Sequence, residues 1–139
     1  MNYFSIIKDV LNEKNKSILD LEKDKIIKKN IFYEFKYCCP SLDNIISIAN
    51  YLEVSIDYIF EKTTQNHFLK YKTQQNNIYK KLIKILQTES ISQVKFCKDL
   101  GISRTNFSRW KNGSQPKLST ILEISNYLNL SIDDLLDKE

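Results

Sequence analysis

The chain has 139 residues, enough for one ordinary domain or two small ones. Its hydrophobic content of 42% supports a folded core and excludes wholesale disorder, and no stretch approaches the roughly 20 apolar residues that a membrane span requires. The net charge of +4 is far below that of proteins that hold nucleic acid by charge alone, which argues against that class.

The N-terminal segment and the cysteines both indicate a cytoplasmic protein. Met1–Asp9 is amphipathic and lacks the basic start and the cleavage site of a secretory signal. The three cysteines are odd in number and form no C-x-x-C pair, so they fit neither a disulfide framework nor a zinc site, and no metal is expected. We expect reduced thiols, with Cys97 in the core and one or both of Cys38 and Cys39 buried.

An internal repeat organises the chain. A shift of about 76 residues places Pro40–Ile45 on Pro116–Ile121 and Asn50–Asp57 on Asn126–Asp133 without a gap. The same shift carries the apolar residues of the first predicted helix onto a matching set, that is, Tyr3, Ile6, Ile7 and Val10 onto Tyr79, Leu82, Ile83 and Leu86. A pattern kept in register from end to end predicts two copies of one small domain.

The two copies are expected at 1–62 and 77–139, joined by a linker at 63–76. The linker is polar and rich in Gln, Asn and Thr. Phe68 and Tyr71 are spaced to share a helix face, so part of it is expected to be helical. With only two Gly and two Pro in the whole chain, each copy is predicted to hold about five short helices, an all-α fold.

The third helix of the first copy, expected at Lys28–Lys36, is bulky and aromatic. Phe32, Tyr33 and Phe35 cannot all face inward on a helix that also buries Ile31. Part of this aromatic surface is therefore expected to be exposed, which indicates a protein–protein surface.

The second copy shows the clearest helical spacing. Apolar residues recur at helical intervals, and Ser131 followed by Asp133 and Asp134 has the signature of a helix start, as Ser55 has in the first copy. The five helices are expected at Ile78–Gln87, Gln93–Leu100, Arg104–Lys111, Leu118–Leu128 and Ile132–Leu136.

The most specific pattern lies between Gln93 and Gly113. A short amphipathic stretch ends at Leu100, and Gly101 can turn with positive φ at no steric cost. Ser103 then caps a second short helix, which Gly113 closes. Two helices joined by so tight a turn predict a helix-turn-helix. The apolar residues expected to fix the angle between them are Phe96, Cys97, Leu100, Ile102 and Phe107. Trp110 either packs on this motif or reaches a phosphate through its indole N–H.

These residues resemble the Cro and phage-repressor type of helix-turn-helix domain. The resemblance covers the second copy completely and the first through its outer helices only. It implies two tandem five-helix domains, the first degenerate, and double-stranded DNA as the partner of the helix that starts near Arg104. The resemblance also implies that five residues of this helix read base edges: Arg104, Thr105, Asn106, Ser108 and Arg109. The chemistry fits, since Arg offers a fork for guanine O6 and N7, although both arginines can also be read as ordinary surface residues.

Phosphate contacts are expected beside that helix, from Gln93, Asn112, Ser114 and Lys117. Gln93 opens a helix whose free N–H groups favour an anion. Lys117 stands where the first copy has Ser41, an ordinary N-cap, whereas Lys cannot cap and its charge opposes the helix dipole. A poor local choice at a helix start is explained if a phosphate binds there. The alternative is a solvated lysine of little consequence.

The charges divide unevenly between the copies. Residues 1–63 hold nine Lys against ten acids, and residues 77–139 hold ten Lys and Arg against seven acids. No acid lies between Asp99 and Glu123, a stretch that contains four basic residues and both arginines of the chain. Such a patch is typical of a DNA-facing surface.

The first copy departs from the motif. Lys25 and Tyr37 stand in place of the turn glycine and the closing glycine. We expect this copy to serve packing or homodimerisation rather than base reading. As an alternative, its third helix contacts phosphates through Lys28, Lys29 and Asn30.

The sequence therefore predicts a sequence-specific transcriptional regulator, most simply a repressor. If only the second copy reads bases, a two-fold dimer is needed to span a palindrome; if both copies read, one chain can bind two unequal half-sites. An antitoxin or anti-repressor that grips a partner protein is the competing class. No enzyme and no cofactor are expected, because the lone His67 has no acidic or thiol partner nearby and no phosphate-binding loop or nucleophile motif is present.

Overall fold

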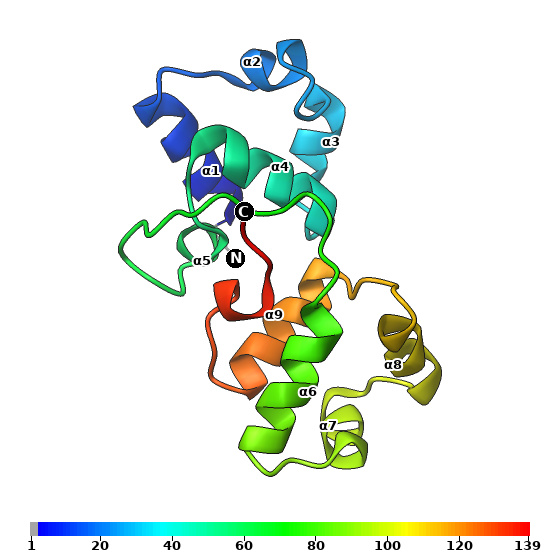
Figure 1. The fold of residues 1–139 in the computed structure, drawn as a ribbon. Helices are drawn as coiled ribbons and strands as arrows, with labels where there is room; N and C mark the ends of the chain where they lie inside the picture. The colour runs from blue at the N-terminus through cyan, green and yellow to red at the C-terminus, as the bar shows by residue number, and fades with distance from the viewer. Residues whose placement is uncertain (1–2) are drawn as a thin grey trace. The chain divides into compact units, whose positions relative to one another are not determined.

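The computed structural model describes residues 3–139, so Met1 and Asn2, which begin the expected first domain and its amphipathic segment, lie outside the described residues. Within that range the chain forms nine α-helices and one 3₁₀-helix and no strand, which confirms the all-α class (Figure 1). No helix among the described residues has the length and apolar character that a membrane span requires. Two compact units are present: the chain up to Thr73 together with Lys138–Glu139, and Gln74–Asp137.

The first unit contains five short helices around one core. They are α1 (Tyr3–Glu13), α2 (Ile18–Lys23), α3 (Lys29–Glu34), α4 (Leu42–Leu52) and α5 (Ile56–Ile59). One apolar stripe of each helix is buried, as the spacing of its apolar residues requires. The side chains of Ile7, Leu21, Phe32 and Ile45, from four different helices, are fully buried and form the centre of this core.

The second unit repeats this order of elements. It contains α6 (Ile78–Thr88), α7 (Gln93–Leu100), α8 (Arg104–Lys111), α9 (Leu118–Tyr127) and the 3₁₀-helix η1 (Asp133–Leu135). The predicted bounds of α7 and α8 are confirmed, and those of α6 and α9 differ by one residue. The last helix is shorter than predicted and is of the 3₁₀ type, because Leu136 is already extended and leads into Asp137.

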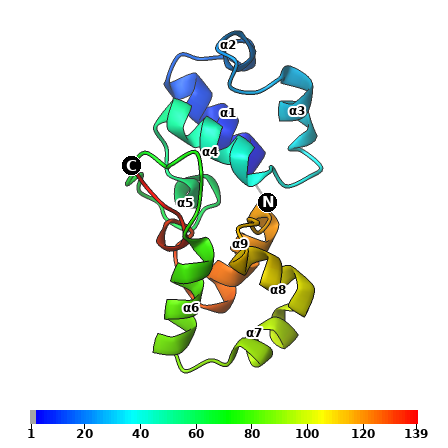
Figure 2. The ribbon, with the colours of Figure 1, turned by 45° about the vertical axis from the view of Figure 1, so that its right-hand side comes forward.

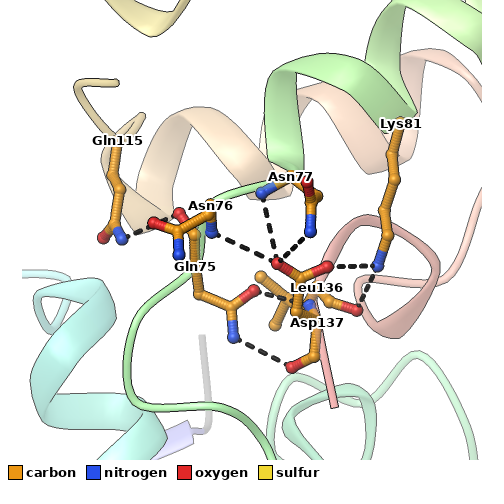
Figure 3. A network of polar contacts seen from close by, with 7 residues as sticks. All are labelled: Gln75, Asn76, Asn77, Lys81, Gln115, Leu136 and Asp137. Carbon is orange, nitrogen blue, oxygen red and sulfur yellow. Dashed lines mark hydrogen bonds and ion pairs between the residues drawn. The ribbon is translucent and has the colours of Figure 1, made fainter.

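Asp137 is the centre of a buried polar network in the second unit (Figure 3). Its Oδ2 accepts hydrogen bonds from the backbone N–H groups of Asn76 and Asn77 at 3.2 and 3.1 Å, just before α6 begins. Its Oδ1 lies 3.0 Å from Nζ of Lys81. Its backbone pairs with the side-chain amide of Gln75, which is itself buried. A side chain from the end of the unit thus holds the backbone that leads into the first helix of that unit.

The segment expected to be a linker, 63–76, is not independent of the units. It contains no helix, so the prediction of partial helicity was wrong, and residues through Thr73 belong to the first unit. Tyr71 is fully buried, and its hydroxyl accepts a hydrogen bond from the N–H of Ile56 at 2.8 Å. The side-chain amide of Asn50 bonds to both the N–H and the carbonyl of Tyr71. These bonds hold the backbone around Tyr71 in an extended conformation, so this segment does not form a helix.

Left-handed backbone positions occur in both units. Lys25 has a φ of 60° and Gly101 a φ of 67°, and these residues are 76 apart. The N-caps of α2 and α7, Ser17 and Ser92, are only 75 apart. Tyr37 has no positive φ, so it does not take the conformation of Gly113, whose φ is 106°.

The gapless shift of 76 residues is therefore wrong for the first helix. The buried residues Ile7 and Leu11 of α1 correspond to Leu82 and Leu86 of α6, a spacing of 75. The segment between the N-cap and the left-handed residue is one residue shorter in the first unit. The gap is hidden in the sequence because neighbouring apolar residues, such as Ile83 beside Leu82, match in either register.

We expect Lys25→Gly to stabilise the first unit by about 0.5–1 kcal/mol, because a side chain with positive φ is strained and glycine is not. Gly101→Ala should destabilise the second unit by about 1 kcal/mol for the converse reason, since open space surrounds Gly101 and only its backbone conformation opposes a Cβ. Urea denaturation of both variants tests the pair. A loss of stability in Lys25→Gly would contradict this interpretation.

Candidate nucleic-acid interface

The turn between α7 and α8 is fixed by local hydrogen bonds. Gly101 ends α7 in the left-handed region, and the N–H of Ile102 then donates to the Cys97 carbonyl at 2.8 Å. Ser103 caps α8, its Oγ accepting from the N–H of Asn106 at 3.1 Å. The chain therefore changes direction within three residues, as the predicted helix-turn-helix requires (Figure 2).

An aromatic core beneath the turn sets the angle between the two helices. Phe96 is fully buried, and its ring lies 6.0 Å from that of Phe107, which in turn lies 5.7 Å from Trp110. Trp110 is 9% exposed, so its ring packs in this core. Cys97 is also buried, and burial raises the pKa of its thiol although the charge of Arg104 opposes the rise. Leu100 and Ile102, expected in the core, are only half-buried.

A hydrogen bond clamps α7 onto α9. The hydroxyl of Tyr127 donates to Oδ2 of Asp99 at 2.6 Å, and this bond raises the pKa of Tyr127. In the first unit, the hydroxyl of Tyr51 donates in the same way to Asp24 at the end of α2, and the bond raises the pKa of Tyr51 to about 12. The second helix of each unit is therefore held by a tyrosine from the fourth.

The predicted base-reading residues all lie on one side of α8, away from the core. Arg104, Thr105, Asn106, Ser108 and Arg109 are exposed, whereas Phe107 and Trp110 between and beyond them are buried. Within residues 3–139, neither guanidinium takes part in a hydrogen bond or an ion pair. Both arginine forks are thus available to an external partner.

The predicted phosphate-binding residues flank the same surface. Gln93 is the first residue of α7, Asn112 and Ser114 follow α8, and Lys117 precedes α9; all four are exposed. Lys117 occupies the N-cap position of α9 and provides no side-chain cap. Ser41 at the start of α4 does cap, accepting from the N–H of Asn44 at 3.2 Å. The backbone N–H groups at the start of α9 therefore lack the partner that those of α4 have.

A family model described as the Cro/C1-type HTH DNA-binding domain matches residues 81–139. Residues 81–139 form a Cro/C1-type DNA-binding domain. Such a domain implies DNA binding, and its family is typically non-enzymatic. The comparisons with curated proteins and with solved structures found no match.

The first unit presents a more aromatic surface around α3 and the loop that follows it. Phe32 and Phe35 of this region are buried, but Tyr33 is 37% exposed and Tyr37 is 86% exposed. The prediction that part of the aromatic surface is exposed is therefore confirmed. Nζ of Lys36 lies 5.2 Å from the centre of the Tyr33 ring, so a cation covers part of this one exposed aromatic. The alternative phosphate contacts of this unit, Lys28, Lys29 and Asn30, are also exposed.

Two expectations about the cysteines had different outcomes. Cys97 lies in the core of the Cro/C1-type domain, as predicted. Cys38 and Cys39 are both exposed, so the prediction that one or both are buried was wrong. The loop before Pro40 buries the proline ring instead, and the phenol of Tyr3 bonds the carbonyl of Cys38 rather than its thiol. Among residues 3–139, no three His, Cys, Asp or Glu side chains are grouped to hold a metal ion.

Proposed function

We propose that the protein is a cytoplasmic, sequence-specific transcriptional regulator, acting as a repressor, and that α8 enters the major groove of its operator. The observation that carries this proposal is the pair of exposed, unpaired arginines on a capped helix of a Cro/C1-type domain. Bound at its operator, the protein would exclude other proteins from that site, which is sufficient for repression.

Base reading is assigned to the outward side of α8. Arg104 and Arg109 each offer two parallel donors that match O6 and N7 of guanine. Thr105 offers a hydroxyl or a methyl to the neighbouring base, and Asn106 and Ser108 lie close enough to add hydrogen bonds. Phosphate contacts from Gln93, Asn112, Ser114 and Lys117 then fix the register of the helix in the groove. No acid is present between Asp99 and Glu123 to repel the DNA backbone.

Replacing Lys117 tests whether this residue contributes to DNA binding at a cost to the stability of the second unit. Lys117→Ser should stabilise the second unit by about 0.5–1 kcal/mol, because serine caps α9 as Ser41 caps α4. The same variant should bind all duplexes more weakly and lower the slope of log affinity against log salt by about one. Anisotropy titrations across salt, with urea denaturation, provide both values. An unchanged salt slope would remove Lys117 from the phosphate-binding set.

We further propose that the first unit is a degenerate copy of the same domain. The shared order of elements, the left-handed Lys25 and Gly101, and the tyrosine–aspartate clamp of each unit support this. Counted from the helix N-caps Lys28 and Ser103, Glu34 of α3 stands where Arg109 stands in α8, so the copy is unsuited to read guanine there. Homodimerisation through its exposed aromatic surface would supply the second half-site of a palindromic operator.

The competing proposal is that this aromatic surface grips a different protein, as in an antitoxin or anti-repressor. The exposure of Tyr37 and Tyr33 is the observation that favours it. Sedimentation of the wild type and of Tyr37→Ser separates the cases: a dimer that the substitution weakens supports homodimerisation, and a monomer favours another partner.

Selection of duplexes from a random pool, followed by gel shifts across salt, tests the function itself. Specific binding should survive competitor DNA and weaken as salt rises. A chain that enriches no sequence, and whose weak binding disappears with competitor, would contradict the proposal.

A further inference from the structure

A cavity of about 500 Å³ opens between α6, α7 and α8 in the second unit. Its apolar wall is formed by Tyr79, Val94, Cys97, Ile102 and Phe107. Val94 is 63% exposed although it is apolar, and the hydroxyl of Tyr79 makes no hydrogen bond within residues 3–139. The cavity falls within the range of about 300–1,000 Å³ that is usual for small-molecule sites.

The same cavity is lined by three cations and no acid. Lys98, Arg104 and Lys111 contribute to its lining, and their side chains have no hydrogen bond or ion pair within the described part of the chain. Asp99, the acid next to Lys98, does not line the cavity and accepts a hydrogen bond from Tyr127 instead. A low-dielectric wall beside uncompensated cations concentrates positive potential inside the cavity.

We propose that this cavity binds a small amphipathic anion, with an apolar or aromatic body and one carboxylate or sulfonate group. The body would cover Val94 and the edge of Phe107, removing exposed apolar area from water. The acidic group would pair with Lys98 and Arg104. Inorganic phosphate fits less well, because it would satisfy the cations and leave the apolar wall in water.

Such a ligand would act as an inducer. Arg104 belongs both to the cavity and to the base-reading set, so a bound anion would neutralise the arginine that the DNA needs. This regulatory consequence rests on the proposed function, whereas the binding of the anion does not.

The fluorescent sulfonate 1-anilinonaphthalene-8-sulfonate, added to the full chain, tests the site directly. We expect saturable binding of one probe per chain, which inorganic phosphate does not displace at equal ionic strength. Lys98→Ala should weaken this binding by roughly three- to fivefold. Lys95→Ala is the matched control, since Lys95 is exposed on the same helix and does not line the cavity. Equal affinities of the two variants, or displacement by phosphate, would overturn the assignment.

A second measurement uses the thiol in the cavity wall. In a Cys38→Ser, Cys39→Ser background Cys97 is the remaining cysteine. The probe should slow its alkylation by iodoacetamide several-fold, and an unchanged rate would place the probe elsewhere and overturn the proposal. Neither measurement needs DNA, so a chain that binds the probe but enriches no duplex refutes the proposed function alone. If both sites exist, saturating probe should lower the affinity for the selected duplex, and unaltered affinity would refute the inducer role.

Discussion

Arg104→Ala and Arg109→Ala should each weaken binding to the preferred duplex by about 1–3 kcal/mol, and each should relax the base preference at one position. The loss is expected because a bidentate arginine–guanine pair is replaced by an unsatisfied base edge. Both side chains are exposed and unpaired within residues 3–139, so their removal should leave the folded state unperturbed. Anisotropy titrations with the selected duplex and its single-base variants, at one salt concentration, measure both effects.

Arg109→Lys is the matched control for charge. Lysine keeps the positive charge but lacks the planar fork, so this variant should retain binding to unrelated duplexes and lose discrimination at one base pair. Thermal denaturation of all three variants should match that of the wild type. If the alanine variants bound preferred and scrambled duplexes with equal proportional loss, the arginines would be phosphate contacts and not base readers.

Asp137→Asn should lower the free energy of unfolding of the second unit by about 2–3 kcal/mol. The carboxylate is buried and has three kinds of partner: the N–H groups before α6, the ammonium of Lys81 and the side chain of Asn77 (Figure 3). An asparagine keeps the volume but loses the charge that compensates Lys81. Urea denaturation, followed by the fluorescence of Trp110 in this unit, gives the difference.

Glu139→Gln is the matched control for Asp137→Asn. Glu139 forms an ion pair with Lys70 at 3.1 Å, but both side chains are more than half exposed. Exposed ion pairs contribute about 0–1 kcal/mol, so this variant should be close to the wild type. A cost for Asp137→Asn as small as that of the control would show that the network is not a source of stability.

The contribution of Asp137 should also depend on pH. Burial alone would raise the pKa of this carboxyl, but the charge and hydrogen bond of Lys81, with hydrogen bonds from Asn77 and Asn76, hold the pKa below its ordinary value. Its stabilising effect is therefore present above the pKa of the unfolded chain, about 3.9, and is lost as pH falls through the lower folded value. The difference in stability between the wild type and Asp137→Asn should shrink below about pH 4. A difference that grew in acid would contradict this sign.

Local chemistry made α7 and α8 predictable from the sequence. Ser92 and Ser103 cap their helices, and Gly101 adopts the left-handed conformation that ends α7. The residues that fix each end of a helix therefore lie within a few positions of that end. The outward side of α8 was predictable in part, because Phe107 was expected in the core. Trp110, which the sequence left open between the core and a phosphate contact, completes the buried stripe.

The errors arose where distant residues decide the conformation. The last helix is shortened because Leu136 and Asp137 bind residues in the range 75–81, more than 50 positions earlier in the sequence. The segment around Tyr71 is extended because Asn50 binds its backbone, a contact that spacing within the segment does not reveal. The cavity beside Val94 is likewise formed by three helices together, and no local pattern announces it.

The most direct test of the central claim is a 7-deazaguanine scan of the selected operator. This base lacks N7 but keeps Watson–Crick pairing, so it removes the major-groove acceptor that the arginines of α8 are proposed to bind. Wild-type protein should lose affinity at particular guanines, and each such guanine should cease to matter in either Arg104→Ala or Arg109→Ala. If the same guanines remained sensitive in the double alanine variant, α8 would not be the helix that reads the DNA.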